Sequence, residues 1–234
     1  MRAMDALDSV CPDGRAAWLA RIAHAWRARV IERAARLEPA AARAYFGLPC
    51  GAWRRAGCAA RRAWLTAAVG AVAPPVDAFD VPAARLALLT RAELGRALLA
   101  RALFARADAL RRCIDAARLD AFDAYAGAGF ARRLLSASVD MGAATVVEPL
   151  LDDGPMSAWI HDGWRRICIE PDLDPRAAAL IAPALPLDGA ANDACVPDDA
   201  LGAIFFSRLP QLFPELTWLF GCETMKAAWA STAT

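Results

Sequence analysis

Lysine is almost absent from this chain of 234 residues, because only Lys226 among its 27 basic residues is not an arginine. This bias, with an excess of alanine, is typical of a GC-rich genome and does not by itself indicate guanidinium chemistry. Histidine is also scarce, since His24 and His161 are the only two and lie far apart. Zinc sites draw on clustered histidine and cysteine ligands, so we expect no metal and no other cofactor.

Long apolar runs are missing too. No window reaches the roughly 18 uninterrupted apolar residues that a membrane-spanning helix needs, although apolar residues make up 58% of the chain. The N-terminus lacks the basic and then apolar layout of a secretory signal. The seven cysteines form no C-x-x-C pair, and their odd number and wide spacing indicate reduced thiols, mostly in the core. We therefore expect a cytoplasmic protein.

Motifs for nucleophilic catalysis and nucleotide binding are absent: there is no G-x-S-x-G, no G-x-x-x-x-G-K-[ST] and no G-x-G-x-x-G. His161 and Asp162 are adjacent in "WIHDGW", but such a pair at a turn is more often solvated than catalytic. The acidic pairs at 152–153 and at 172 and 174 stand beside Gly and Pro, where aspartate commonly forms turns. We expect no enzyme, and keep a helical enzyme using His161 and these acidic loops as an alternative.

The charges are divided unequally along the chain. Residues 1–133 contain 22 arginines and 12 acidic residues, a net charge of +10, whereas residues 134–234 contain 5 basic and 14 acidic residues, a net charge of −9. The division indicates two halves that attract each other or that present opposite faces to partners.

Nucleic-acid binding is a second alternative, because the first half is rich in arginine. Its basic cluster would be Arg54, Arg55, Arg61 and Arg62, which alternate with tryptophans. We do not favour this function, since the acidic second half would repel phosphates and the other arginines do not form a stripe.

Helical patterns dominate the first half. One helix is predicted after "CPDGRAAW" up to a stop at Pro39, and a second at about 51–72, which the prolines of "APPVDAFDVP" end. Thr90 and Glu93 form a capping box that predicts a third helix from Arg91.

Arginine recurs at every fifth residue through the leucine-rich stretch 88–115. A step of five residues turns about 140° around a helix axis, so these side chains spread over the whole circumference. We therefore predict a helix with neighbours on several sides, whose arginine stems lie along apolar residues while their heads reach water or carboxylates. The five are Arg91, Arg96, Arg101, Arg106 and Arg111.

An apolar seam follows in the same stretch and predicts continued helix. Outward-facing charges at i,i+4 predict the ion pairs Asp108–Arg112 and Arg111–Asp115. Arg106 is the expected position of a kink, or of a break between two antiparallel helices. The seam consists of Leu103, Ala107, Leu110, Ile114 and Ala117.

The second half differs in composition. Between residues 134 and 200, β-branched and aromatic residues bounded by Gly, Pro and Asp predict two or three short strands. A helix capped by Asp198 or Asp199 follows, and a last amphipathic helix is predicted after Pro210. The fold class is therefore mainly α, an irregular multi-helix domain with two or three short β-strands in the C-terminal half. Either residues 1–75 form an N-terminal helical region beside 76–234, or 1–234 is a single domain.

Residues 86–122 resemble the central helices of the SctK-type proteins of bacterial type III secretion systems, the YscK, OrgA and MxiK group. In that family a leucine-rich helix opens after a Ser/Thr-x-x-Glu cap and leads into an "LRRCID"-like segment; here these are Thr90 to Glu93 and Leu110 to Asp115. The stretch "RLPQLFPELTWLFG" is similar to the plant-pathogen-like branch.

The resemblance implies a non-enzymatic adaptor in the cytosolic sorting platform of this virulence-associated system. Such a protein links the cytoplasmic domain of the inner-membrane ring protein (SctD-type) to the pod protein (SctQ-type). It contacts no nucleic acid and reaches the membrane through proteins only. Arginine and aromatic residues are enriched at interface hot spots. Most of the eight tryptophans are expected in the core, and Trp218 and Trp229 could instead anchor a partner, although core packing is favoured for Trp218. Our partner-binding candidates are Arg111, Arg112, Asp115, Phe213 and Trp218.

Overall fold

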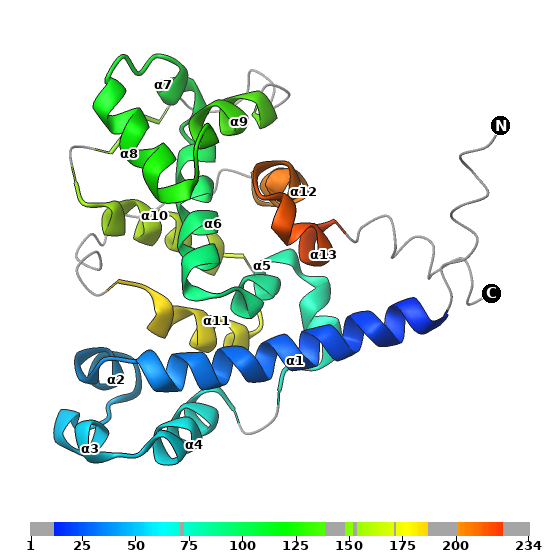
Figure 1. Cartoon of the computed structure of the whole chain (residues 1–234), viewed down its shortest axis with the longest axis vertical. Coiled ribbons are helices and arrows are strands. Elements are labelled where there is room, and N and C mark those ends of the chain that lie inside the picture. Colours follow the sequence, from blue (N-terminus) through cyan, green and yellow to red (C-terminus); the bar gives the residue numbers. More distant parts are fainter. Residues whose placement is uncertain are drawn as a thin grey trace.

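The computed structural model describes residues 12–70, 73–138, 148–151, 154–170, 172–186 and 201–221. Figure 1 shows α1 as a long helix near one end of the molecule, with α2 at its C-terminal end, α3 and α4 on one side and the later helices on the opposite side. The N-terminal helices are α1 (Pro12–Arg36), α2 (Pro39–Phe46), α3 (Cys50–Arg55) and α4 (Cys58–Val69). The central elements are η1 (Val76–Asp80), α5 (Pro82–Arg85), η2 (Leu86–Leu88), α6 (Arg91–Phe104), α7 (Ala107–Arg111), α8 (Ala116–Ala126) and α9 (Phe130–Ala137). The last are α10 (Met156–Cys168), α11 (Pro175–Ile181), η3 (Ala182–Ala184), α12 (Gly202–Leu212), η5 (Pro214–Leu216) and α13 (Thr217–Phe220).

The central helix α6 confirms the prediction made from its arginine spacing. Thr90 and Glu93 form the expected capping box, in which Glu93 N–H donates to the Thr90 hydroxyl at 3.2 Å and Thr90 N–H donates to the Glu93 carboxylate at 2.8 Å. Every residue from Ala97 to Phe104 is buried, including Arg101. Hence α6 is surrounded by other elements and presents no cationic stripe.

The predicted strands are wrong for the part of the chain that the structure describes, where every regular element is a helix. Residues 158–168 belong to α10, which packs against α6. Trp159, Ile160, Gly163 and Ile167 recur at helical spacing and are buried, so tertiary packing prevails over their β-propensity. Much of the other expected strand region, residues 139–147, lies outside the described residues.

The helix predicted at 51–72 is divided. Ala56 adopts an extended conformation (φ −70°, ψ 133°) between α3 and α4. This break lets α4 turn back, so that the rings of Trp53 and Trp64 lie 5.9 Å apart. Trp53 is fully buried, and its indole N–H donates to the carbonyl of Leu37 at 2.8 Å. Satisfying that N–H and packing both rings favours two short helices over one long one.

The predicted seam at 103–117 is correct only as far as Leu110. The expected break at Arg106 is confirmed, but the chain leaves α7 after Arg111, and Ile114 is 98% exposed. Asp115 starts α8 by accepting a hydrogen bond from the backbone N–H of Arg118. A strong N-cap thus begins a new helix where periodicity predicted a continuing one.

The ion pairs predicted in this stretch are also wrong. Asp108 pairs with Arg111 one position closer along α7, and Arg112 instead donates to the backbone carbonyl of Asp108. Asp115 pairs with Arg118. Because the helix ends, the i,i+4 partners of the predicted pairs no longer share one face.

The C-terminal helices differ from the prediction in their boundaries. Pro210 lies inside α12 rather than ending it, and the residues after Phe213 form two short elements, η5 and α13. The apolar positions are nevertheless buried as expected, namely Leu212, Phe213, Leu216, Leu219 and Phe220. The expected caps Asp198 and Asp199 lie outside the described residues.

The cysteines among the described residues are free thiols, as predicted, but their expected core location is wrong. Cys58 and Cys168 are exposed, and Cys50 and Cys113 are half-buried. Apolar packing is supplied mainly by leucine, alanine and aromatic side chains instead.

Candidate functional site

His161 and Asp162 lie in the middle of α10 and are both buried, so the interpretation of this pair as a solvated turn is wrong. They bind different partners. The His161 imidazole contacts the carbonyl of Pro186 through Nε2 at 2.5 Å, whereas the Asp162 carboxylate accepts hydrogen bonds from arginines. The two side chains therefore do not form a catalytic dyad, which requires the imidazole to face the carboxylate or a nucleophile.

Asp162 is the centre of a buried ionic cluster. Arg106 donates to both of its oxygens, from Nη1 at 2.6 Å and from Nη2 at 3.2 Å. Arg166 Nε donates at 3.0 Å and Arg165 Nη2 at 3.2 Å. Glu148 completes the cluster, since its carboxylate lies 3.3 Å from Arg106 and accepts two hydrogen bonds from Arg166.

The electrostatics of this cluster keep its groups charged. Burial alone would raise the pKa of Asp162, but the hydrogen bonds and charges of Arg106 and Arg166 hold that pKa below its usual value. Burial would lower the pKa of Arg166, but hydrogen bonds to Glu148 and the charge of Asp162 raise it. A carboxylate with its oxygens occupied by four N–H donors is a poor proton acceptor, because the arginines stabilise its ionised form. The cluster therefore holds helices together rather than transferring protons.

Of the other acidic residues, the described Asp172 and Asp174 form no hydrogen bond with His161. Asp174 caps α11 by accepting from the backbone N–H of Arg176 at 2.8 Å, which confirms its prediction as a turn former. Asp172 is exposed, and residues 152–153 lie outside the described part. Among the described residues, no group of three or more His, Cys, Asp and Glu side chains is arranged to hold a metal ion.

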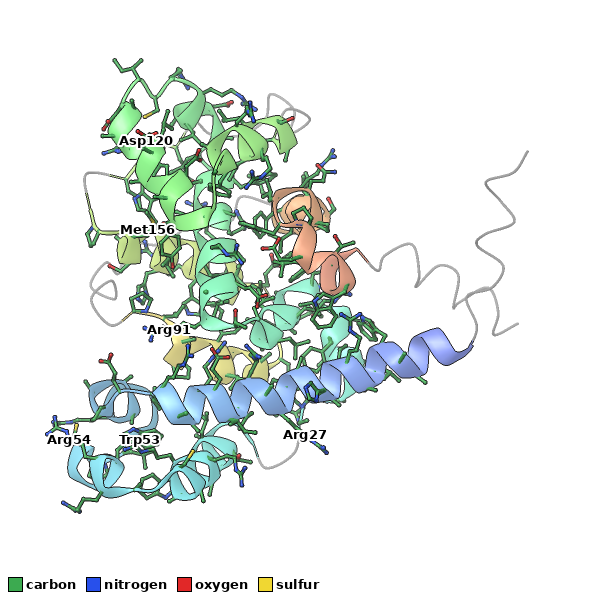
Figure 2. The ribbon with its side chains drawn as sticks, in the orientation of Figure 1. Arg27, Trp53, Arg54, Arg91, Asp120 and Met156 are labelled. Atoms are coloured by element: carbon green, nitrogen blue, oxygen red, sulfur yellow. The ribbon has the colours of Figure 1, made fainter. Side chains whose placement is uncertain are left out.

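The predicted basic cluster is partly used in local packing. Arg61 lies over the ring of Trp53 at 5.5 Å, and its Nε donates to the Trp53 carbonyl at 3.1 Å. Arg54, Arg55 and Arg62 remain exposed on α3 and α4. Figure 2 shows Arg54 at the outer edge of these helices.

Three of the five partner-binding candidates lie together on the turn between α7 and α8, at the end of the molecule opposite α3 and α4 (Figure 1). Arg111, Arg112 and Asp115 are all exposed there. They flank Ile114, whose side chain sequence reasoning had placed in the core. The signal that would have located it is Asp115 itself, an N-cap residue directly before "AARLDAF".

The two aromatic candidates lie elsewhere, towards the C-terminus. Phe213 is only 2% exposed and stacks on Phe130, with ring centroids 5.7 Å apart. Trp218 is half-buried, and the guanidinium of Arg21 lies 4.4 Å from the centre of its ring. Hence Phe213 packs in the core, whereas Trp218 and Arg21 present a cation–π pair at the surface.

Comparison with protein families matches residues 10–215 to the family described as bacterial type III secretion protein (HrpB4). The chain belongs to this family. HrpB4 membership confirms the resemblance to SctK-type proteins as far as the secretion system is concerned, and the match spans α1 to α12. No curated protein and no solved structure matches the chain. Within the described residues of this HrpB4-family protein, none of the helices combines the length and apolarity needed to cross a membrane.

Proposed function

We propose that this HrpB4-family protein is a non-enzymatic adaptor of the cytosolic sorting platform, at the cytosolic face of the inner membrane. It links the cytoplasmic domain of the SctD-type ring protein to the SctQ-type pod protein. Family membership supports a role in type III secretion. The buried Asp162 cluster supports a non-enzymatic role, because its ionisable groups are held in contacts between helices.

The observation that supports docking most directly is Ile114. It is 98% exposed at the tip of the α7–α8 turn, whereas the other exposed large apolar side chains among the described residues are at most 48% exposed. Full burial of such a side chain stabilises an assembly by about 1.5–3 kcal/mol. Arg111, Arg112 and Asp115 surround it with charge. An apolar anchor with a charged rim is the usual composition of a protein interface.

The experiment measures binding of the purified chain to the two partners from the same organism. Ile114→Asp is expected to weaken binding to one partner by about tenfold or more, since an apolar anchor would be replaced by a charge. Ile169→Asp is the matched control, because Ile169 is 48% exposed at the end of α10. Circular dichroism should show the same helix content for Ile114→Asp as for the wild type. If the wild-type chain binds neither partner, the proposed adaptor function is contradicted.

A further inference from the structure

A cavity of about 330 Å³ lies where the N-terminal helices meet the start of α6 and the residues around η3. Arg36, Glu38 and Arg91 line its polar part. Its apolar part consists of Ala41, Pro183, Leu185 and Pro186. Figure 2 shows Arg91 at the first turn of α6, on the side where this helix approaches α1. The cavity therefore combines guanidinium groups with an apolar wall, which suits a ligand that has both an anionic group and an apolar part.

Positive charge exceeds negative charge around this cavity. Three arginines share the carboxylate of Glu32, which lies 2.6 Å from the guanidinium of Arg29, 3.4 Å from that of Arg33 and 3.7 Å from that of Arg36. It also accepts a hydrogen bond from the backbone N–H of Arg91 at 3.4 Å. The guanidinium of Arg91 has no hydrogen bond or ion pair to any residue that the structure describes.

The pKa of the buried Arg33 reflects the same excess of positive charge. The pKa of Arg33 is lowered to about 10, mainly by burial and also by the charges of Arg29, Arg91 and Arg36, against the single opposing effect of Glu32. Its Nη1 is buried without a hydrogen-bond acceptor. One further carboxylate near these guanidinium groups would offset a repulsion that Glu32 alone does not balance.

The N-terminal segment that contributes Arg36 to the cavity has an excess of positive charge. Residues 16–70 contain ten arginines and two acidic residues. Arg21, Arg27, Arg43, Arg54 and Arg55 are among those exposed. Exposed charges of one sign on this segment favour the approach of an oppositely charged ligand.

We propose that this cavity, called here the Arg36–Arg91 cavity, receives an acidic peptide segment of one of the two partner proteins. A carboxylate of that segment binds between the guanidinium groups of Arg36 and Arg91, which can each offer paired N–H donors. Apolar side chains next to that carboxylate contact Ala41 and Leu185. The inference rests on the proposed function, since it names the chemistry by which the adaptor recognises one partner.

The probe is a set of overlapping synthetic peptides that cover the cytoplasmic domain of the ring protein and the pod protein of the same organism. The full-length chain is applied to the set, and the peptides that bind are titrated by fluorescence anisotropy. We expect the bound peptides to contain Asp or Glu next to apolar residues. Replacing their acidic residues by Asn and Gln should abolish binding, because the carboxylates are the groups that the arginines hold.

The decisive variant is Arg36→Gln with Arg91→Gln, which is expected to weaken the best peptide by about tenfold or more. Arg54→Gln with Arg62→Gln is the matched control, since it removes the same charge from exposed positions outside the cavity. The control should change the affinity by less than about threefold, through long-range attraction alone. If the double variant at the cavity does not fold, Arg91→Gln alone is measured, because that guanidinium has no internal partner to lose.

Several results would overturn this inference. Equal losses in the cavity and control variants would mean general attraction between charged surfaces. Capture of neutral or basic peptides, or equally strong competition by inorganic phosphate, would also contradict a peptide site. These results differ from failure of the proposed function. If the chain binds neither full-length partner, the adaptor function is rejected. If the cavity variants bind as well as the wild type, only the proposed peptide site in the Arg36–Arg91 cavity is rejected.

Discussion

Arg106 donates hydrogen bonds from both terminal nitrogens to the carboxylate of Asp162, at 2.6 and 3.2 Å, although the two residues are 56 positions apart in the sequence. The same guanidinium donates from Nε to the carbonyl of Pro149 and from Nη1 to that of Ala102, each at 3.0 Å. Arg106 stands at the break between α6 and α7. One side chain thus ties that break to α10 and to the segment at 148–151.

Replacing Asp162 by Asn should therefore destabilise the fold strongly. The amide has a similar volume but leaves buried arginine charge with only Glu148 to balance it. Breaking one side of a buried ion pair costs roughly 3–5 kcal/mol, which is measurable as a lower free energy of unfolding in urea. Asp120→Asn, at an exposed position on α8, should change it by less than about 0.5 kcal/mol. A loss below about 1 kcal/mol for Asp162→Asn would contradict a stabilising role for the cluster.

Stability should also fall in acid. Despite burial, which acts in the other direction, arginine contacts lower the pKa of Asp162 and of Asp174 below the reference value of 3.8. A carboxylate whose pKa is lower in the folded state stabilises that state fully above the unfolded pKa, and this contribution is lost as the pH falls through the folded pKa. The free energy of unfolding, measured by urea denaturation at a series of pH values, should decrease as the pH falls below about 4. A value that stays constant down to pH 3 would contradict this expectation.

The contact between α6 and α10 depends on a residue without a side chain. A Cβ atom at Gly163 would lie 1.9 Å from the carbonyl oxygen of Leu98, which is backbone and cannot move aside alone. Gly163→Ala should therefore push the helices apart and lower the thermal midpoint of unfolding. Gly51→Ala is the control: its new methyl group would meet only the flexible end of Arg55, and alanine favours helix over glycine by roughly 0.5–1 kcal/mol. Similar midpoints for the two variants would contradict the close packing at Gly163.

The parts of the fold that the sequence predicts depend on neighbouring residues. Thr90 and Glu93 are three positions apart, so their capping box could be read directly. The break at Arg106 was also predicted, although its ionic partner was not, because Asp162 comes from a distant helix. A capping box within one turn is visible in a sequence, whereas buried ion pairs between helices depend on tertiary packing.

The errors have two origins, tertiary packing and a helix start that periodicity did not reveal. Residues 158–168 were expected as strand because isoleucine and tryptophan favour β-structure in general. Their burial against α6 stabilises a helix instead. Ile114 was expected in a seam because periodicity alone does not show that Asp115 begins a new helix. The Arg36–Arg91 cavity could not be predicted, since it joins residues from α1, α2, α6 and the segment after α11.

The division of the chain at residue 75 remains a prediction, and cooperativity of unfolding tests it. One apolar cluster contains Leu65 and Val69 of α4 together with residues from 79 to 220. Trp26 of α1 also packs edge-to-face on Phe79, with ring centroids 5.9 Å apart. Residues on both sides of position 75 therefore share one core, which favours the single-domain alternative.

We accordingly expect helix content and tryptophan fluorescence to change in one coincident urea transition, as in a two-state domain. Leu65→Ala, which empties a fully buried position in α4, should shift both signals together and lower stability by about 2–5 kcal/mol. Ala67→Gly is the comparison, because Ala67 is exposed on the same helix and its loss affects mainly local helix propensity, by roughly 1 kcal/mol. Two separate transitions, with Leu65→Ala shifting only the first, would instead establish residues 1–75 as an independent unit, because a core shared across position 75 cannot be disrupted on one side alone.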